Sequence, residues 1–148
     1  MQELQYSVVI DAPREHVWET MLGHDTYRQW VDVSWPGSLF KGEWTQGTEM
    51  SFHGGEGQGG TLALLKIVEP FSHVHAEHVA VIGEDGSEDR ESDIAKGWIG
   101  TTEQYTFTDK GGGTELVVDI TTSPDWVEMF DSGWPAALQS LKQLSEKG

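Results

Sequence analysis

The sequence predicts an α+β fold in which an antiparallel sheet of about six to seven strands packs against one long C-terminal helix. Between residues 47 and 122, apolar segments of strand length are separated by clusters of turn residues. Only the part from Val127 onward carries a long run of apolar residues at steps of three and four. A sheet with one apolar face needs a cover, and this helix is its only long candidate.

Length and composition narrow the class of protein. With 148 residues, the chain fits one domain spanning residues 1–148. The absence of cysteine excludes a disulfide framework, a thiolate zinc site and a cysteine nucleophile. A formal charge of −16 argues against nucleic acid and anionic membrane surfaces as partners. No apolar run has the length of a membrane span and the first residues lack a signal-peptide pattern, so a cytoplasmic location is expected.

The N-terminal third predicts one strand followed by two short helices. Residues 4–11 alternate, with Tyr6, Val8 and Ile10 on one face. Residues 11–22 follow as a helix with Pro13 in its first turn, and residues 24–32 form a second helical segment. The strand therefore leads directly into a helical pair.

The middle of the chain is predicted to be strands. Turn and strand over 35–44 are followed by strands over 47–54, 61–70, 73–82, 98–108 and 114–122. The glycine-rich residues 54–60 predict a turn, and residues 109–114 predict a hairpin. The acidic segment 83–96 is interpreted as an irregular, mobile loop.

The C-terminal segment has the apolar pattern of a helix but also contains two residues that disfavour a helix, Gly133 and Pro135. Ser123 is a candidate N-cap with Pro124 after it, and the apolar stripe consists of Phe130, Trp134, Ala137, Leu138, Leu141 and Leu144. Pro135 costs about 3 kcal/mol inside a helix and Gly133 up to about 1 kcal/mol. We therefore predict that the helix bends or begins anew within one turn of Pro135. A bend that closes over a cavity and two helices without functional meaning both remain open at this stage.

Three segments resemble a known family. VVIDAPREHVW, WIGTTEQYTFTDKGGGTELVV and EMFDSGWPAALQSLKQL are similar to the Hsp90-ATPase-activator-homologue (AHSA1-like) branch of the START-like (SRPBCC) superfamily of ligand-binding proteins. The resemblance implies a single START-like domain with the helix-grip fold, in which a curved sheet surrounds the long helix and leaves a cavity. KGEWTQGTEM replaces the family's RPGG-like turn, and Pro135 follows the Gly-Trp pair.

Aromatic and thioether side chains exceed what one core layer requires, which indicates a pocket wall. Glu103, Tyr105 and Phe107 share one face of a strand that the resemblance turns inward. Glu103 is expected either to serve acid–base chemistry or ligand hydrogen bonding, or to meet Arg28, Lys66 or water at the cavity mouth in a structural role. The expected ligand-binding residues are Trp30, Trp35, Phe40, Phe52, His78, Trp98, Glu103, Tyr105, Phe107, Met129, Trp134 and Leu138.

Other polar patterns are interpreted as structural. His73, His75 and Glu77 alternate on one strand face, but converging ligands are missing, so we expect them to face solvent and hold no metal. His78 lies on the opposite face, where it either orients a ligand or donates to a neighbouring strand. Residues 54–60 lack the Lys and Ser/Thr of a phosphate loop, and no cofactor is expected.

The favoured function is non-catalytic binding of a small, largely apolar molecule that is lipid-like or polyketide-like. The resemblance also implies an alternative, a co-chaperone that docks on the middle region of Hsp90. A third hypothesis is a cyclase or hydrolase that acts through Glu103 with Tyr105 or His78.

Overall fold

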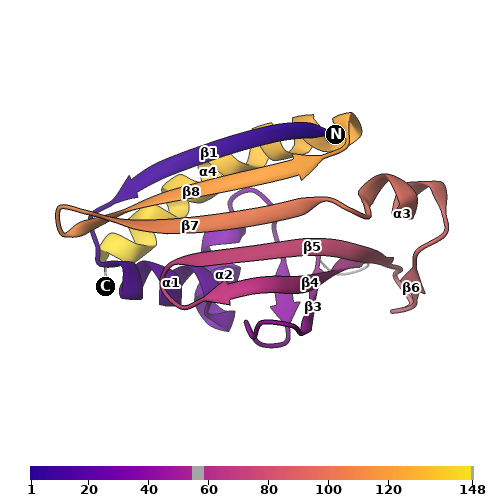
Figure 1. The fold of residues 1–148 in the computed structure, drawn as a ribbon, viewed down its shortest axis with the longest axis horizontal. Helices are drawn as coiled ribbons and strands as arrows, with labels where there is room; N and C mark the ends of the chain where they lie inside the picture. Colours follow the sequence, from indigo (N-terminus) through magenta and orange to yellow (C-terminus); the bar gives the residue numbers. More distant parts are fainter. Residues whose placement is uncertain (55–58, 148) are drawn as a thin grey trace.

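The computed structural model describes residues 1–54 and 59–147, and its sheet is antiparallel with the order β1-β8-β7-β5-β4-β3-β2 (Figure 1). The strands are β1 (Gln2–Ile10), β2 (Leu39–Lys41), β3 (Glu49–His53), β4 (Gly60–Glu69), β5 (His73–Ile82), β6 (Glu88–Asp89), β7 (Thr102–Lys110) and β8 (Gly113–Thr122). The helices are α1 (Arg14–Leu22), α2 (His24–Val31), α3 (Asp93–Trp98), a 3₁₀ turn η1 (Pro124–Trp126) and α4 (Val127–Lys147). The short β6 pairs with β5 outside the main strand order.

The long helix α4 runs along the inner face of the sheet, and the short helices α1 and α2 contact it from one side (Figure 1). Two polar contacts tie it to β1. Tyr6 donates its hydroxyl to Asp131 Oδ1 at 2.5 Å, and Lys142 Nζ donates to the Val9 carbonyl at 2.9 Å. The predicted α+β fold, with a curved sheet, one long helix and two short helices after the first strand, is confirmed.

The hairpin between β7 and β8 is as tight as the sequence predicts. Lys110 pairs with Gly113, so only Gly111 and Gly112 form the loop. Their φ angles are 61° and 95°, a region that glycine adopts without steric cost. The predicted turn over 54–60 falls largely on residues 55–58, which lie outside the described residues.

Helix α4 is continuous through Pro135, so the prediction that a helix begins anew there is wrong. The proline removes one backbone hydrogen bond, but contacts from the α2–β2 loop support the same turn. Ser34 Oγ donates to the Gly133 carbonyl at 2.6 Å. The Trp35 ring packs so closely that a Cβ on Gly133 would lie 2.3 Å from it. A bend within the continuous helix stays a prediction.

The acidic segment after β5 is not a plain loop, so that prediction is wrong as well. It contains β6 and α3, and Ser92 caps α3 by accepting the Ala95 N–H at 3.1 Å. Trp98, predicted to start a strand, is the last residue of α3. The acidic composition hid a short helix because Ile94, Ala95 and Trp98 are its only apolar residues.

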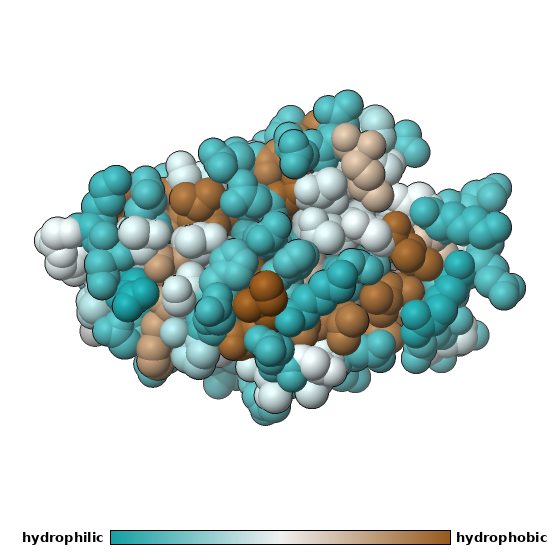
Figure 2. All heavy atoms as spheres, in the orientation of Figure 1, coloured by the Kyte–Doolittle hydropathy of each residue, from teal (hydrophilic) through white to brown (hydrophobic). Residues whose placement is uncertain are grey.

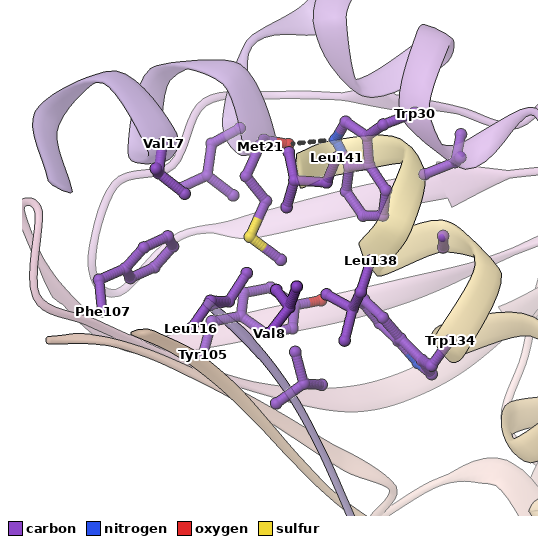
Figure 3. Close-up of a cluster of buried hydrophobic side chains, with 14 of the residues drawn as sticks. Val8, Val17, Met21, Trp30, Tyr105, Phe107, Leu116, Trp134, Leu138 and Leu141 are labelled. Carbon is purple, nitrogen blue, oxygen red and sulfur yellow. Dashed lines mark hydrogen bonds between the residues drawn. The ribbon is translucent and has the colours of Figure 1, made fainter. Parts of the chain in front are cut away.

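A closed hydrophobic core lies between the C-terminal half of α4, the helix α1 and the strands β1, β7 and β8. Figure 3 shows its side chains packed from both sides; the side-chain polar atoms among them are those of Tyr105, Trp30 and Trp134, and Trp30 Nε1 donates to the Met21 carbonyl at 3.0 Å. Its fully or nearly fully buried members include Ile10, Val17, Met21, Phe107, Leu116, Leu138 and Leu141. This core holds one end of α4 on the sheet.

The sheet face that turns away from α4 is mainly hydrophilic, with isolated apolar groups (Figure 2). His73, His75 and Glu77 lie on the less buried face of β5, but they are half-buried rather than fully exposed. His73 hydrogen-bonds to Thr106, and Glu77 pairs with Lys66 at 2.7 Å. Among the described residues, no group of three His, Asp or Glu side chains is placed to hold a metal ion. Within residues 1–54 and 59–147, no helix is long and apolar enough to cross a membrane.

Candidate functional site

A pocket of about 580 Å³ lies beside the N-terminal half of α4. Its wall is built from α2 and the loop after it, from α3, and from the strands β3, β4, β5 and β7. Helix α4 and the η1 turn contribute Trp126, Met129, Phe130 and Trp134. The pocket therefore occupies the helix–sheet interface that the closed core leaves unfilled.

The pocket forms where two strands separate. β5 and β7 are paired from His73 opposite Thr106 to Glu77 opposite Thr102. Two last hydrogen bonds link His78 with Gly100 and Thr101, and beyond them the chain of β7 gives way to α3. On its other edge β5 has a bulge, because Ala63 faces His78 whereas Leu62 faces Ala80. The extra residue, Val79, places both His78 and Val81 on the pocket wall.

Nine of the described lining residues are Phe, Tyr or Trp. Trp134 is central, with ring centroids 5.6 Å from Trp35 and 6.0 Å from both Trp30 and Tyr105. Further along, Trp98 stacks on Phe130 at 5.9 Å. Rings of this size are rigid and offer large apolar surfaces to a ligand.

Three polar side chains form one hydrogen-bonded cluster in this aromatic wall. His78 Nε2 lies 2.5 Å from Glu103 Oε2, and Tyr105 donates its hydroxyl to Glu103 Oε1 at 3.1 Å. The Glu103 side chain is 16 % exposed and that of His78 only 4 %. Glu103 is thus held by an imidazole and a phenol, and the expected pairing with Arg28 or Lys66 is wrong.

Burial and the charge of Glu103 together shift the pKa values of the neighbouring tyrosines. Burial, followed by the negative charge of Glu103, raises the pKa of Tyr27 and that of Tyr105 well above the ordinary value. Burial, followed by the nearby Lys41, lowers the pKa of His53. None of the described lining residues is Lys or Arg. The phenols therefore remain neutral, and Glu103 is the only carboxylate among the described lining residues.

Several lining nitrogens lack a hydrogen-bond partner within the described part of the chain. They are buried, and they comprise His78 Nδ1 and the indole Nε1 atoms of Trp98, Trp126 and Trp134. Buried polar atoms in folded proteins are usually paired, and four of the nine unpaired ones among the described residues lie at this pocket. A bound molecule with acceptor atoms can satisfy them after small side-chain shifts.

The edge of the pocket has exposed apolar side chains. Ile94 on α3 is 66 % exposed and Met129 on α4 is 38 % exposed, and both are lining residues. They stand out because few large apolar side chains of the described residues are this accessible. An apolar rim of this kind is typical of a ligand entrance.

The structure brings most of the predicted ligand-binding residues to this pocket: Trp30, Trp35, Phe52, His78, Trp98, Glu103, Tyr105, Met129 and Trp134. It places Phe40, Phe107 and Leu138 elsewhere. Phe107 packs on Trp18 at 5.3 Å in the closed core, on the far side of the cluster from Trp134 (Figure 3). Leu138 also belongs to this core, and Phe40 packs on Trp44 in a second cluster. The substitution Leu138→Trp would therefore overpack the core and would not enter the pocket.

Other lining residues were not predicted from the sequence. Tyr27 lies three residues before Trp30 and four before Val31 on α2, so the helical period was a usable signal for these two, whereas Ser34 lies beyond the end of α2. Phe130 lies one turn before Trp134 on the stripe already recognised. Trp126 and Ile94 had no such signal, because η1 and α3 are too short to show periodicity.

The comparisons with known proteins agree with this architecture. The family model for Activator of Hsp90 ATPase homolog 1-like protein (AHSA1) matches residues 11–146. No curated protein matches the sequence.

Three solved structures illustrate the similarity of fold. Protein Ms6760 from Mycobacterium smegmatis has a TM-score of 0.75 and 18% identity, with 96% of this chain and 89% of that chain covered. The Aha1 dimer from Colwellia psychrerythraea has a TM-score of 0.72 and 18% identity, with coverage of 99% and 97%. CalU16 from Micromonospora echinospora has a TM-score of 0.67 and 18% identity, with coverage of 97% and 75%.

Proposed function

We propose that this chain, which belongs to the family of Activator of Hsp90 ATPase homolog 1-like proteins, binds a small, largely apolar molecule in the pocket beside α4 and does not convert it chemically. The observation that carries the proposal is an aromatic pocket of about 580 Å³ with one polar cluster in its wall. A volume of this size and composition is common for small-molecule sites. Apolar burial would supply most of the affinity, and the cluster of His78, Glu103 and Tyr105 would orient the ligand.

A fluorescent dye tests this proposal. N-phenylnaphthylamine is neutral and apolar, and we expect its emission to rise on binding and to saturate at one dye per chain. Val81→Trp places a large ring on the pocket wall and should abolish binding. Val9→Trp makes the same change at an exposed position of β1 and should leave binding intact. Equal binding by both variants, or none by the unmodified protein, would contradict the proposal.

Proton transfer in the same pocket is a second candidate, favoured by the geometry of the polar cluster. A carboxylate held between an imidazole and a phenol can accept a proton from a carbon beside a carbonyl group. Deuterium exchange of α-tetralone in heavy water provides a test. Exchange faster than in buffer, and lost in Glu103→Gln, would establish this chemistry. Exchange at the same rate as in buffer would refute proton transfer, and ligand binding would be the remaining function of the pocket.

Docking on an Hsp90-type chaperone is the remaining candidate, and it is motivated by the description of the family and by the net charge of −16. An acidic surface would require a basic patch on the chaperone. Stimulation of the chaperone's ATPase by the purified chain, reduced at high ionic strength, would support it. A pocket variant such as Val81→Trp should not affect this interaction, which separates it from ligand binding.

A further inference from the structure

The charge lining the pocket has one sign. Glu103 is the carboxylate, the two histidines are His53 and His78, and no Lys or Arg occurs among the described lining residues. Lys41 lies close enough to lower the pKa of His53, but it belongs to β2 and does not line the pocket. A ligand with a carboxylate or phosphate would therefore meet a negative group and no permanent positive one.

Two further basic residues, Lys66 and Arg90, are engaged away from the pocket. Lys66 pairs with Glu77 on the outer face of the sheet. Arg90 pairs with Glu88 and donates to the Val79 carbonyl. The contacts of Glu103 are instead His78 and Tyr105, neither of which carries a permanent positive charge.

Several aromatic rings line the pocket together with this carboxylate. Tyr105 bonds to it directly, and the Tyr105 ring lies 6.0 Å from that of Trp134. Trp134 in turn lies 6.0 Å from Trp30, and Tyr27 is close enough for Glu103 to raise the pKa of its phenol. The face of an aromatic ring attracts a positive charge, most strongly for tryptophan. A carboxylate among tryptophan and tyrosine rings is the chemical environment that recognises an organic cation.

We propose that the ligand of this pocket is an amphiphilic organic cation, in which an ammonium group lies beside Glu103 and an apolar body fills the aromatic pocket. The inference rests on the proposed ligand-binding function and specifies its chemical class. The negative charge of the whole protein favours the approach of the same class of ligand.

The unpaired indole nitrogens of Trp98, Trp126 and Trp134 favour an acceptor atom instead, such as a carbonyl oxygen. The indole N–H groups are neutral donors, whereas Glu103 is ionised. A hydrogen bond from a ligand ammonium group to Glu103 is about twice as strong as one from an indole to a neutral acceptor, so Glu103 has the larger influence on the ligand class. The two preferences are compatible in one molecule, because a carbonyl or ether oxygen can accompany an ammonium group. An anionic ligand would satisfy the indoles but would face Glu103.

Three probes of similar shape separate these preferences. Naphthylmethyl-trimethylammonium is a cation, neopentylnaphthalene is its neutral isostere, and naphthylacetate is an anion. Each is measured by its displacement of N-phenylnaphthylamine at physiological salt. We expect the cation to bind at least about tenfold more tightly than its neutral isostere, which corresponds to about 1.4 kcal/mol, and the anion to bind most weakly.

Two variants assign the preference to Glu103. Glu103→Gln should bring the cation to within about threefold of the neutral probe, because the carboxylate is gone while the amide keeps hydrogen-bonding capacity. Glu3→Gln removes the same charge from an exposed position of β1 and should change nothing. If Glu103→Gln does not fold, the cation preference of the unmodified protein is measured at high salt instead. A preference that persists there is assigned to Glu103, because a buried ion pair is screened less than distant surface charge.

The outcomes are distinct. A neutral or anionic probe that binds as tightly as the cation, while the dye binds, would overturn this inference and leave the proposed function standing. A cation preference that persists in Glu103→Gln, or that disappears at high salt, would attribute the effect to net charge and also overturn it. Failure of the dye itself to bind would refute the proposed function.

Discussion

The two halves of α4 face the same sheet and bury it in different ways. The C-terminal half places Ala137, Leu138 and Leu141 in a closed core, in which each is at most 2 % exposed. The N-terminal half places Phe130 and Trp134 on the wall of an open pocket. The comparison shows that a helix–sheet interface becomes a binding site where the sheet beneath the helix is interrupted.

The strands explain the difference. Beneath the C-terminal half, β1, β8 and β7 pair along their whole lengths, so α4 meets a continuous surface that aliphatic side chains can fill. Beneath the N-terminal half, the pairing of β7 with β5 ends at Thr102, the first residue of β7, and Trp98 of the preceding helix α3 lies beside His78. Pro135 lies near the boundary between the two halves, in the middle of a continuous helix.

Truncation should separate the two halves most strongly. Leu141→Ala leaves a hole in the closed core and should lower the free energy of unfolding by about 2–5 kcal/mol. Met129→Ala removes a side chain of similar size from the pocket rim, and its cost should stay within about 1 kcal/mol because the side chain is already 38 % exposed. Urea unfolding measures both. Losses of equal size would mean that the pocket half is packed like the core.

The boundary itself can be altered at Pro135. Pro135→Ala restores a backbone donor for the Asp131 carbonyl, and since α4 is already continuous we expect a gain of about 1–3 kcal/mol in stability. Pro135→Gly restores the same donor and should gain about 1 kcal/mol less, because glycine is the weaker helix former. Thermal unfolding of the pair provides the measurement. A loss of stability in Pro135→Ala would show that the proline is required by the packing.

The close contact of Gly133 with Trp35 sharpens the comparison on the pocket side. In Gly133→Ala the new Cβ would lie 2.3 Å from the ring, so Trp35 must move away from the pocket wall. We expect weaker dye binding and a net loss of about 1 kcal/mol, despite the better helix propensity of alanine. Gly97→Ala, in the helix α3 with open space around it, is the control and should be neutral or stabilising. Unchanged dye affinity in Gly133→Ala would contradict the role of Trp35 in the wall.

The smallest expected effect concerns pH. All three tyrosines, Tyr6, Tyr27 and Tyr105, have a pKa raised above the ordinary value of 10.0, first because of burial. A raised pKa in the folded state favours the protonated phenol, so its contribution to stability is complete below pH 10 and declines as pH rises toward the folded-state value. Absorbance at alkaline pH should show no tyrosine ionising near pH 10 in the folded protein. Ionisation of one tyrosine there, before unfolding, would place that phenol in water.

The sequence predicted the parts of the molecule that local periodicity determines. The stripe on α4, the hairpin at Gly111 and Gly112, and the shared face of Glu103 and Tyr105 follow from spacing along single elements, whereas the inward direction of that face came from the family resemblance. The family resemblance supplied the relation between helix and sheet.

The remaining features depend on contacts between distant segments. Phe107 lies on the same strand face as Glu103, yet it belongs to the closed core, where its ring packs on Trp18 of α1. The bulge at Val79, which brings His78 and Val81 to one wall, depends on the register with β4. Continuity at Pro135 depends on Ser34 and Trp35, about a hundred residues earlier in the chain. None of these relations leaves a periodic signal in the sequence.

The central claim is that ligand binding is confined to the N-terminal half of α4, and the seven tryptophans test it directly. With ¹⁵N-labelled indoles, each tryptophan gives its own N–H resonance. On titration with N-phenylnaphthylamine, the resonances of Trp30, Trp35, Trp98, Trp126 and Trp134 should shift, because these residues line the pocket. Trp18, beside Phe107 in the closed core, and Trp44, packed on Phe40, should not move. Shifts of Trp18 and Trp44 as large as those of the lining residues, or no shifts at all, would contradict the account.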